Sequence, residues 1–491
     1  MREAAMWIDH VDAPAEGGHH MTVENPATEE TIGRVARAQR ADVDAAVNAA
    51  RRAQPGWRRT PALSRAQLLH EIAARIRVQH HALAETLTLE GGKPMIENLD
   101  EIEWVTACFD YYAEIGRHSR GSSIPPGFEH QVNFTVKEPY GVVACIVPFN
   151  YPLLLMAWKV APALAAGNTV IIKPADETPL ATLELAQAFS CLPPGVVSIV
   201  TGTGEEAGEA LVSHPGVDLI AFTGSTATGK RIMRAAADRL AKVNLETSGI
   251  DPFIVCEDAD IEIAARAAVW ARYLNAGQVC TSAKRIYVVD RVADAFTERF
   301  IANAREVRVG DPRDPATDMG PLISKAALAR VTKAIETAVG EGATLVTGGK
   351  RPAGLGRGHY LEPTVLTGVR HGSSPTREEI FGPVASIVRV TDFDEAIACA
   401  NDSNYGLGAN IYTNNLRYMM QAMEEVKAGT FWVNDPLTDN EAGPFGGMRQ
   451  SGIGRELGEE GLDAFREPKH VHIDYIQERK SYWFPYSDRK W

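Results

Sequence analysis

Cysteine is scarce in this chain, and its few copies are scattered. Six cysteines occur among 491 residues, and no two of them form a C-x-x-C pair. A disulfide framework and a zinc knuckle both need clustered cysteines, so the sequence excludes these two architectures. Scattered cysteines fit a reducing compartment in which a free thiol persists. We therefore expect a cytoplasmic protein without a metal site.

Long hydrophobic runs and blocks of positive charge are also missing. The longest apolar stretches, such as Gly141 to Phe149, fall far short of the ~20 residues that span a bilayer. Acidic residues precede any apolar run at the start of the chain, which is unlike a secretory signal peptide. The 63 acidic and 50 basic residues give a net charge of −13 with no basic stripe. The sequence thus predicts neither a membrane nor a nucleic acid as partner.

The rest of the composition is ordinary for a globular protein, with 45% apolar and 23% charged residues. A chain of 491 residues exceeds one simple core, so we expect two or more domains. Residues 1–40 read as short strands and turns. Amphipathic helices are expected from Ala41 onward, over 64–88 and over 96–115, because apolar residues recur there with the helical period.

From residue 141 the chain alternates short apolar runs with helical segments. The expected strands of a first block are 142–147, 169–173, 196–200 and 219–223. Those of a second block are 253–256, 285–289, 344–347, 386–390 and 431–433. Such alternation is typical of parallel sheets covered by helices on both faces. The predicted fold class is therefore α/β, with two successive α/β units.

Two further stretches alternate with period two outside these blocks, at 131–136 and 470–475. An aromatic tail follows the second stretch, at 482–486. A strand outside a compact domain must cover its edge. A surface hairpin would satisfy this need, but we favour an arm that pairs with another subunit, because the aromatic tail also requires a partner surface.

Cys280 differs from the other cysteines in its surroundings. It follows a Gly277-Gln278 turn and lies among polar residues, whereas Cys256 and Cys399 sit in apolar runs. Glycine permits backbone conformations that other residues resist, so the turn can present the thiol to a cleft. Two interpretations remain open at this point: a nucleophile, or a structural cysteine at a loop-to-helix turn.

Other polar positions lie where apolar strands end, and each is ambiguous by itself. The run Phe222–Lys230 is either a phosphate-binding turn or a plain one. Glu246, after an apolar strand, is a plausible general base. Asn150 is either an oxyanion donor or a turn asparagine. Lys173 and Asp176 are either ribose ligands or parts of a solvated turn.

Taken together and in order, these runs resemble the aldehyde dehydrogenase superfamily, NAD(P)-dependent and hydrolytic, over nearly the whole chain. The matching runs are 148–150, 173–176, 222–226, 246–252, 275–280, 379–383 and 444–456. The fold that the resemblance implies is a Rossmann-type cofactor domain, an α/β catalytic domain and a small β oligomerisation arm. We divide the chain accordingly: 1–118 and 141–252 bind NAD, 253–440 form the catalytic domain, 119–140 and 466–491 form the arm and tail, and 441–465 return to the NAD-binding domain.

By the same resemblance, Cys280 attacks the aldehyde, and Asn150 and the Cys280 backbone N–H hold the oxyanion. Glu246 activates the water that hydrolyses the thioester, while Lys159 and Glu456 relay its proton. The implied cofactor ligands are Lys173, Asp176, Gly224, Ser225, Thr247, Glu379 and Phe381.

Three departures from the family pattern stand out. Asp176 replaces a common Glu; an acid there still repels a 2′-phosphate, so NAD is expected rather than NADP. Ser248 replaces a Gly beside Glu246 and adds a side chain near the site. Phe149 stands where Trp is common.

The expected substrate pocket suits an aliphatic or aromatic aldehyde. Its residues are Tyr151, Met156, Trp158, Leu274, Thr281 and the loop 435–445. This loop is acidic, which argues against dianionic or carboxylated aldehydes. The partners expected are a small-molecule aldehyde and further copies of the chain, as a homodimer or homotetramer.

Two competing functions are distinguished by single residues. A CoA-acylating dehydrogenase lacks the base that Glu246 supplies. A catalytically retired structural or binding member would have lost Cys280 or Glu246, and both are present.

Overall fold

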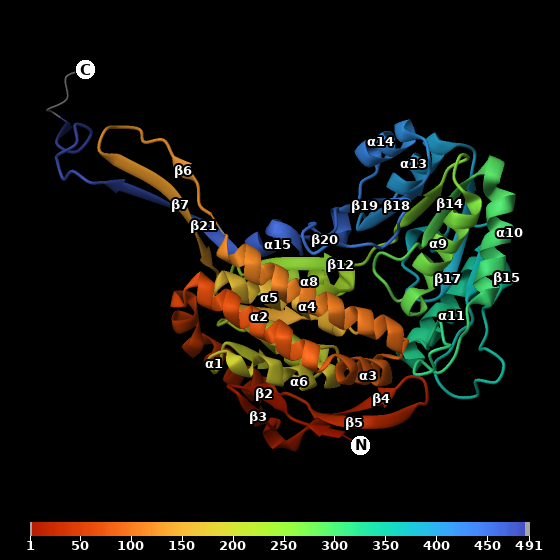
Figure 1. The fold of residues 1–491 in the computed structure, drawn as a ribbon, viewed down its shortest axis with the longest axis horizontal. Helices are drawn as coiled ribbons and strands as arrows, with labels where there is room; N and C mark the ends of the chain where they lie inside the picture. The colour runs from red at the N-terminus through yellow and green to blue at the C-terminus, as the bar shows by residue number, and fades with distance from the viewer. Residues whose placement is uncertain (1, 119, 487–491) are drawn as a thin grey trace.

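The structure is a computed structural model that describes residues 2–118 and 120–486. Figure 1 shows two lobes side by side and a long arm that projects from the first lobe. Each lobe contains its own central sheet, and the chain runs from the first lobe to the second and returns to the first before ending on the arm.

An eight-stranded sheet forms the centre of the first lobe, in the order β20-β12-β11-β8-β9-β10-β2-β3. Its strands are β2 (Met6–Ile8), β3 (Val11–Ala13), β8 (Val142–Ile146), β9 (Thr169–Lys173), β10 (Val197–Ile199), β11 (Leu219–Gly224), β12 (Lys242–Thr247) and β20 (Gly452–Ile453). The five strands from β8 to β12 are parallel. Their almost fully buried residues explain the continuous apolar runs in the sequence.

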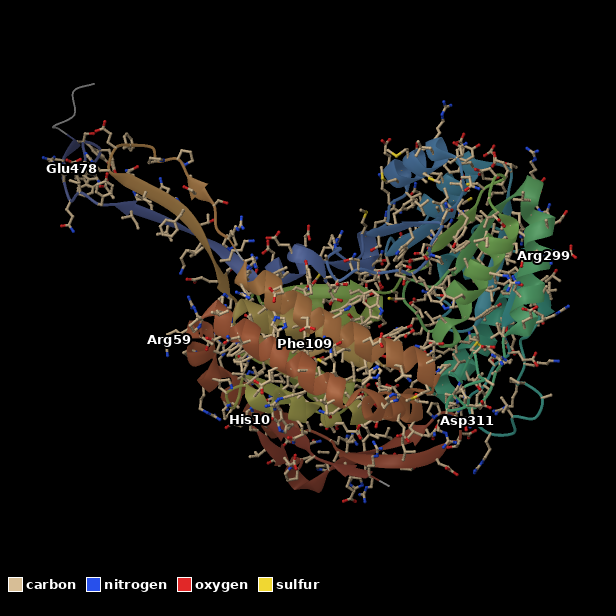
Figure 2. The ribbon with its side chains drawn as sticks, viewed as in Figure 1. His10, Arg59, Phe109, Arg299, Asp311 and Glu478 are labelled. Carbon is tan, nitrogen blue, oxygen red and sulfur yellow. The ribbon has the colours of Figure 1, made fainter. Side chains whose placement is uncertain are left out.

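Helices cover both faces of this sheet. They are α1 (Arg40–Arg59), α2 (Ala62–Val78), α3 (His80–Gly91), α4 (Met95–Arg117), α5 (Pro152–Ala166), α6 (Leu180–Glu184), α7 (Glu209–Ser213), α8 (Thr226–Ala237) and α15 (Gly458–Asp463). The predicted helix over 64–88 is wrong in one respect, because Gln79, at φ −95° and ψ 5°, divides it into α2 and α3. Phe109 of α4, labelled in Figure 2, has no exposed surface.

A seven-stranded sheet forms the centre of the second lobe, in the order β15-β16-β17-β14-β13-β18-β19. Its strands are β13 (Pro252–Val255), β14 (Arg285–Val289), β15 (Thr344–Thr347), β16 (Thr364–Thr367), β17 (Val384–Val390), β18 (Gly408–Tyr412) and β19 (Thr430–Val433). The covering helices are α9 (Ile261–Tyr273), α10 (Asp290–Glu306), α11 (Lys325–Gly340), α12 (Ser374–Arg377), α13 (Phe393–Asn401) and α14 (Leu416–Glu425). Strands β16 and β18 were not expected, because threonine, glycine and asparagine interrupt their apolar pattern.

The arm is a three-stranded antiparallel sheet of β6 (Ser123–Ile124), β7 (Gln131–Pro139) and β21 (Arg466–Asp474). β21 pairs with β7 along its whole length, so both strands are longer than the alternating stretches predict. Several large apolar side chains on the arm and tail are exposed, among them Phe128, Tyr475, Trp483 and Phe484. A separate small sheet of β1 (Arg2–Ala4), β5 (Glu30–Ala36) and β4 (His20–Asn25) covers part of the first lobe.

The parallel strands bring four candidate residues to one edge of the first sheet. Lys173 ends β9, Gly224 ends β11, Glu246 is the penultimate residue of β12, and Asn150 follows β8. Carboxyl ends of parallel strands meet at the same edge, which is where ligands bind in open α/β sheets. This edge faces the second lobe, which carries Cys280.

Candidate active site

Cys280 lies where two cavities meet. One cavity, of about 180 Å³, is lined largely by aromatic and acidic side chains, and we call it the aromatic cavity. The other, of about 210 Å³, is lined by strand ends and turns, and we call it the polar cavity. Asn150 and Cys280 line both cavities, and no other described residue does so.

The backbone before Cys280 forms a left-handed turn that places this residue at the two cavities. Asn275, Ala276 and Gly277 have positive φ values of 49°, 53° and 72°. A Cβ at Gly277 would lie 2.3 Å from the Gly382 carbonyl oxygen, so only glycine fits there. The buried Arg272 guanidinium holds the turn, because it donates to the carbonyl oxygens of Gly277 and Gly382. The glycine turn expected from the sequence is therefore present.

The thiol of Cys280 is partly buried. Burial raises its pKa well above the usual range, and the negative charge of Glu246 raises it further. Lys284 acts in the opposite direction, because its positive charge favours the thiolate. Reactivity of this sulfur thus depends on the charges placed around it.

Asn150 lies beside Cys280 and is held by the turn 275–278. Its side-chain Nδ2 donates to the Gln278 carbonyl oxygen at 3.0 Å. The Asn275 side chain donates in turn to the Asn150 carbonyl oxygen, also at 3.0 Å. An amide has two N–H donors, so one remains to bind an oxygen in the cavities that Asn150 lines.

Glu246 lines the polar cavity and is almost fully buried. Neither carboxylate oxygen has a hydrogen-bond partner among the described residues. Burial raises the pKa of Glu246 to about 8, with a further contribution from the charge of Glu456, and Lys159 opposes both. A carboxylate with its pKa near neutrality and a free oxygen has the properties of a general base.

Lys159 and Glu456 form a buried ion pair behind Glu246. Lys159 Nζ lies 2.5 Å from Glu456 Oε1 and donates to Thr223 Oγ1 at 2.6 Å. Thr223 itself lines the polar cavity. One hydroxyl group therefore connects this buried pair to the cavity.

Five of the seven expected cofactor residues line the polar cavity: Gly224, Ser225, Thr247, Glu379 and Phe381. Ser225 is the N-cap of α8, and its hydroxyl accepts from the Thr228 N–H. Phe381 meets Phe149 edge to face at 6.0 Å. Ser248, the departure noted in the sequence, lines the same cavity, and its carbonyl oxygen accepts from Ser451.

The other two expected cofactor residues lie apart from that cavity, at the end of β9. Lys173 Nζ donates to Asp176 Oδ1 at 2.9 Å. A second ion pair lies nearby, in which Arg37 Nε is 2.6 Å from Glu206 Oε2. Asp176 adds to the negative charge that Arg37 experiences.

The aromatic cavity receives side chains from one face of α5 and from the residue that precedes it. These are Tyr151, Leu154, Leu155 and Trp158, which follow the helical spacing i, i+3, i+4 and i+7. The expected pocket residues Leu274 and Thr281 also line it. Met156 does not: it is fully buried in the core of the first lobe, because its position on α5 points away from the cavity.

Sequence reasoning missed a second face of this cavity, which α4 supplies. Glu97, Asp100, Glu101 and Trp104 line it, together with Trp270 of α9. The four α4 residues have the same i, i+3, i+4, i+7 spacing, which was the available signal. The loop 435–445 contributes Leu437, Asp439 and Phe445, as expected.

The acids of the aromatic cavity differ in their surroundings. Glu101 is paired with the buried Lys93 and accepts from the N–H groups of Leu153 and Leu154. Burial raises the pKa of Glu97 to about 8 and that of Asp439 to about 7. These two carboxyl groups therefore change charge near neutral pH, and a bound cation would favour their ionised form.

Among residues 2–118 and 120–486, no group of three or more His, Cys, Asp or Glu side chains is arranged to hold a metal ion. In the same part of the chain, no helix has both the length and the apolar character needed to cross a membrane.

Comparisons with known proteins agree with one another. Residues 13–471 match the model of the aldehyde dehydrogenase family. Betaine aldehyde dehydrogenase 1 of Oryza sativa subsp. japonica is 41% identical, over 95% of this chain and 94% of its own length. A chloroplastic aminoaldehyde dehydrogenase of Arabidopsis thaliana is 41% identical, with 92% of each chain covered. The structure of Staphylococcus aureus betaine aldehyde dehydrogenase in complex with NAD+ superposes with a TM-score of 0.96 at 34% identity, over 98% of this chain and 96% of that one.

Proposed function

The chain belongs to the aldehyde dehydrogenase family, and from this premise we propose how its residues oxidise an aldehyde to a carboxylic acid with NAD. The observation that carries the proposal is the position of Cys280 and Asn150 on both cavities. Such a nucleophile can meet an aldehyde from one side and a dinucleotide from the other.

The polar cavity has features that fit the nicotinamide half of NAD. Glu379 Oε1 is buried without a hydrogen-bond partner, so it can accept from a ribose hydroxyl. Gly224 precedes the N-terminus of α8, where free N–H groups favour a pyrophosphate. Thr247 and Phe381 complete the lining, and Lys173 and Asp176 would hold the adenosine ribose. NAD, when bound, supplies the hydride acceptor.

In the first step the Cys280 thiolate adds to the aldehyde carbon. The carbonyl oxygen becomes an oxyanion, which accepts hydrogen bonds from the Asn150 side chain and the Cys280 backbone N–H. Loss of the aldehyde hydrogen as hydride then leaves a thioester on Cys280. The aldehyde carbon has thereby been oxidised to the level of an acid.

In the second step Glu246 removes a proton from a water molecule, and the resulting hydroxide attacks the thioester. The acid departs and the Cys280 thiolate is restored. The proton leaves Glu246 by way of Thr223 toward the Lys159–Glu456 pair, whose contacts link it to the cavity. Hydrolysis by Glu246 argues against acyl transfer to CoA, and the intact nucleophile and base argue against a retired member.

We further propose a cationic aldehyde as substrate, a narrower class than the aliphatic or aromatic aldehyde expected from the sequence. Relatives act on betaine aldehyde and aminoaldehydes by name. In this chain Glu97, Asp100 and Asp439 line the aromatic cavity beside several aromatic rings. A cation is attracted both by carboxylates and by ring faces. Glu101 contributes less, because Lys93 already balances its charge.

NAD is preferred over NADP in this proposal. Asp176 repels a 2′-phosphate, and Glu206 holds Arg37, the nearby cation, in a two-point ion pair. The variant Asp176→Ser should raise the relative affinity for NADPH over NADH about tenfold, measured by fluorescence titration. An unchanged ratio would remove Asp176 from the specificity site.

The arm supports assembly into a homodimer or homotetramer. Its projecting sheet exposes apolar side chains, including Val132 on β7 and Ile473 on β21, which a second copy would cover. Light scattering of wild type and of the Val132→Lys, Ile473→Lys double variant tests this. A wild-type monomer would contradict it.

We propose the domain division 1–118 with 141–252 and 441–465, 253–440, and 119–140 with 466–491, of which residues 1, 119 and 487–491 lie outside the described residues. Membership of β20 in the first sheet and of β13 to β19 in the second supports it.

A cytoplasmic location is proposed because Cys280 must remain reduced, and all six cysteines are free. Cell fractionation tests this location, and limited proteolysis tests the domain division.

The direct test of the proposed function is a screen for NADH formation over aliphatic, aromatic, cationic and carboxylated aldehydes. Activity should be highest with cationic aldehydes, require no CoA and yield the free acid. An absolute requirement for CoA, or no NADH with any aldehyde, would contradict the proposal.

A further inference from the structure

A buried lysine that the reaction above does not use lies directly behind the nucleophile. Lys284 follows Cys280 by four residues, just before β14, and its side chain is 2% exposed. Its ammonium group donates to the Cys280 carbonyl oxygen at 2.5 Å and to the Val279 carbonyl oxygen at 2.8 Å. A charge removed from water in this way must be compensated by the protein.

The counter-charges of Lys284 lie on the side of the polar cavity. Glu379 Oε1 is 3.1 Å from Lys284 Nζ, but the contact lacks the geometry of a hydrogen bond, since that oxygen has no such partner. Asp251, fully buried, feels the lysine charge as well. The Phe381 ring lies 5.8 Å from the ammonium group. Lys284 is therefore paired with Glu379 and lies near Phe381, and both of these residues line the polar cavity.

Glu379 is more exposed than Lys284, at 16%, and it faces the polar cavity. A ribose hydroxyl that donates to Glu379 would draw part of the carboxylate charge away from Lys284. The two carbonyl hydrogen bonds would keep the lysine in place. The positive charge of Lys284 would then be less balanced by Glu379 and would act more strongly on the Cys280 sulfur.

Four charged side chains act on the Cys280 sulfur. Glu246 of β12, Asp251 and Glu379 favour the neutral thiol, whereas Lys284 favours the thiolate. Lys284, which stabilises the thiolate, is thus paired with Glu379, the proposed ribose ligand. Coenzyme binding at Glu379 can therefore change the charge that acts on the Cys280 sulfur.

We propose that Lys284 is a positioning residue that couples coenzyme binding at Glu379 to activation of the Cys280 thiol. In the free enzyme Glu379 holds part of the lysine charge, and the thiol is less reactive. When coenzyme engages Glu379, Lys284 acts on Cys280 and the thiolate fraction rises. The inference rests on the proposed function in taking Cys280 as nucleophile and Glu379 as ribose ligand.

The test measures the alkylation of Cys280 by iodoacetamide across a range of pH, followed by peptide mass spectrometry. Cys191, the other partly exposed cysteine, serves as an internal control in every sample. NADH is the coenzyme form used, because its dihydronicotinamide ring carries no positive charge. Wild type, Lys284→Met and Lys284→Arg are compared with and without NADH.

In wild type, NADH should shift the pH profile of Cys280 alkylation toward lower pH. Without coenzyme, Lys284→Met should react about tenfold more slowly at neutral pH, the effect of a pKa change of about one unit. It should also lose the response to NADH, while Lys284→Arg restores at least part of both. Alkylation of Cys191 should be the same in all samples. An unchanged profile and an unchanged NADH response in Lys284→Met would overturn the proposal.

Glu379→Gln provides a second route if Lys284→Met does not fold. This variant removes the competing carboxylate but keeps the lysine, so its Cys280 should be more reactive than wild type before NADH is added. Reactivity equal to wild type, with a full response to saturating NADH, would also overturn the proposal. The aldehyde screen tests the proposed function separately. If NADH changed the reactivity of Cys280 through Lys284 but no aldehyde were oxidised, the proposed function would be refuted and the role of Lys284 would stand.

Discussion

The two cavities that meet at Cys280 are built in different ways. Turns and strand ends of the first sheet supply most of the polar cavity, including Gly224, Glu246 and Thr247. Helix faces and one loop supply the aromatic cavity, through Glu97, Trp158 and Asp439 among others. Sheet register holds the first set rigidly, whereas side-chain choice on a helix face can vary without altering the backbone.

Because of this difference, we expect the polar cavity to govern the rate of the reaction and the aromatic cavity to govern the choice of aldehyde. Changes in the polar cavity should alter the reaction with every aldehyde, because the proposed mechanism places the coenzyme and the base there. Changes in the aromatic cavity should alter the choice among aldehydes and leave the chemistry intact. A change at Cys280, which belongs to both cavities, should affect every substrate most strongly.

The largest effect is expected at the junction itself. Cys280→Ala removes the proposed nucleophile, so turnover should fall by about 10⁴-fold or more with all aldehydes. NADH binding, measured by fluorescence, should remain within about twofold of wild type. Residual activity above a few per cent of wild type would show that another group carries out the attack.

The next largest effect is expected in the polar cavity, at the base. The pKa of Glu246 is about 8, and a base must be ionised to act, so hydrolysis should slow as pH falls below this value. Glu246→Gln should lower turnover by about 10²–10⁴-fold and abolish this limb of the pH profile. The same pH dependence in the variant would assign the titration to another group.

Asn150 should matter to a smaller extent, because the Cys280 backbone N–H remains as a donor. Asn150→Ala should reduce kcat by about 10²–10³-fold, the usual effect of one lost oxyanion donor. Coenzyme affinity should be retained. Equal losses in kcat and in NADH affinity would instead indicate a structural role through the Gln278 contact.

The smallest effect should come from the aromatic cavity and should depend on the substrate. Asp439→Asn should raise KM about fivefold for a quaternary ammonium aldehyde. It should not change KM for the uncharged tert-butyl analogue of that aldehyde. Asp435→Asn is the matched control, since Asp435 is exposed on the same loop. An equal change in KM with both aldehydes would show that the charge of Asp439 does not select the cationic substrate.

Short sequence motifs pointed to much of the lining of the polar cavity, because most of its residues lie at strand ends or just after them. Glycine turns such as the one before Cys280 have few alternatives, since a Cβ at Gly277 would strike the Gly382 carbonyl. The α/β class and the parallel strands were likewise evident from apolar runs. Strand β18 was missed because Asn410 and Gly408 interrupt its pattern, although both are buried.

The aromatic cavity was harder to predict because it depends on how helices pack. Met156 lies on the same helix as Trp158, but only the latter faces the cavity. Glu97 and Asp100 are more than 170 residues from Cys280 in the sequence, and only the packing of α4 against α5 brings them near. Lys284 was overlooked although it follows Cys280 closely, because its meaning depends on Glu379, which is far away along the chain.

The central claim is that Cys280 forms a thioester that Glu246 hydrolyses. Its most direct measurement is the mass of Glu246→Gln after brief mixing with NAD and an aldehyde, followed by peptide mapping. The account predicts an acyl group on the peptide that contains Cys280, in close to one copy per chain, and far less of it on wild type. NADH released without any acyl group, or an acyl group on a different cysteine, would contradict it.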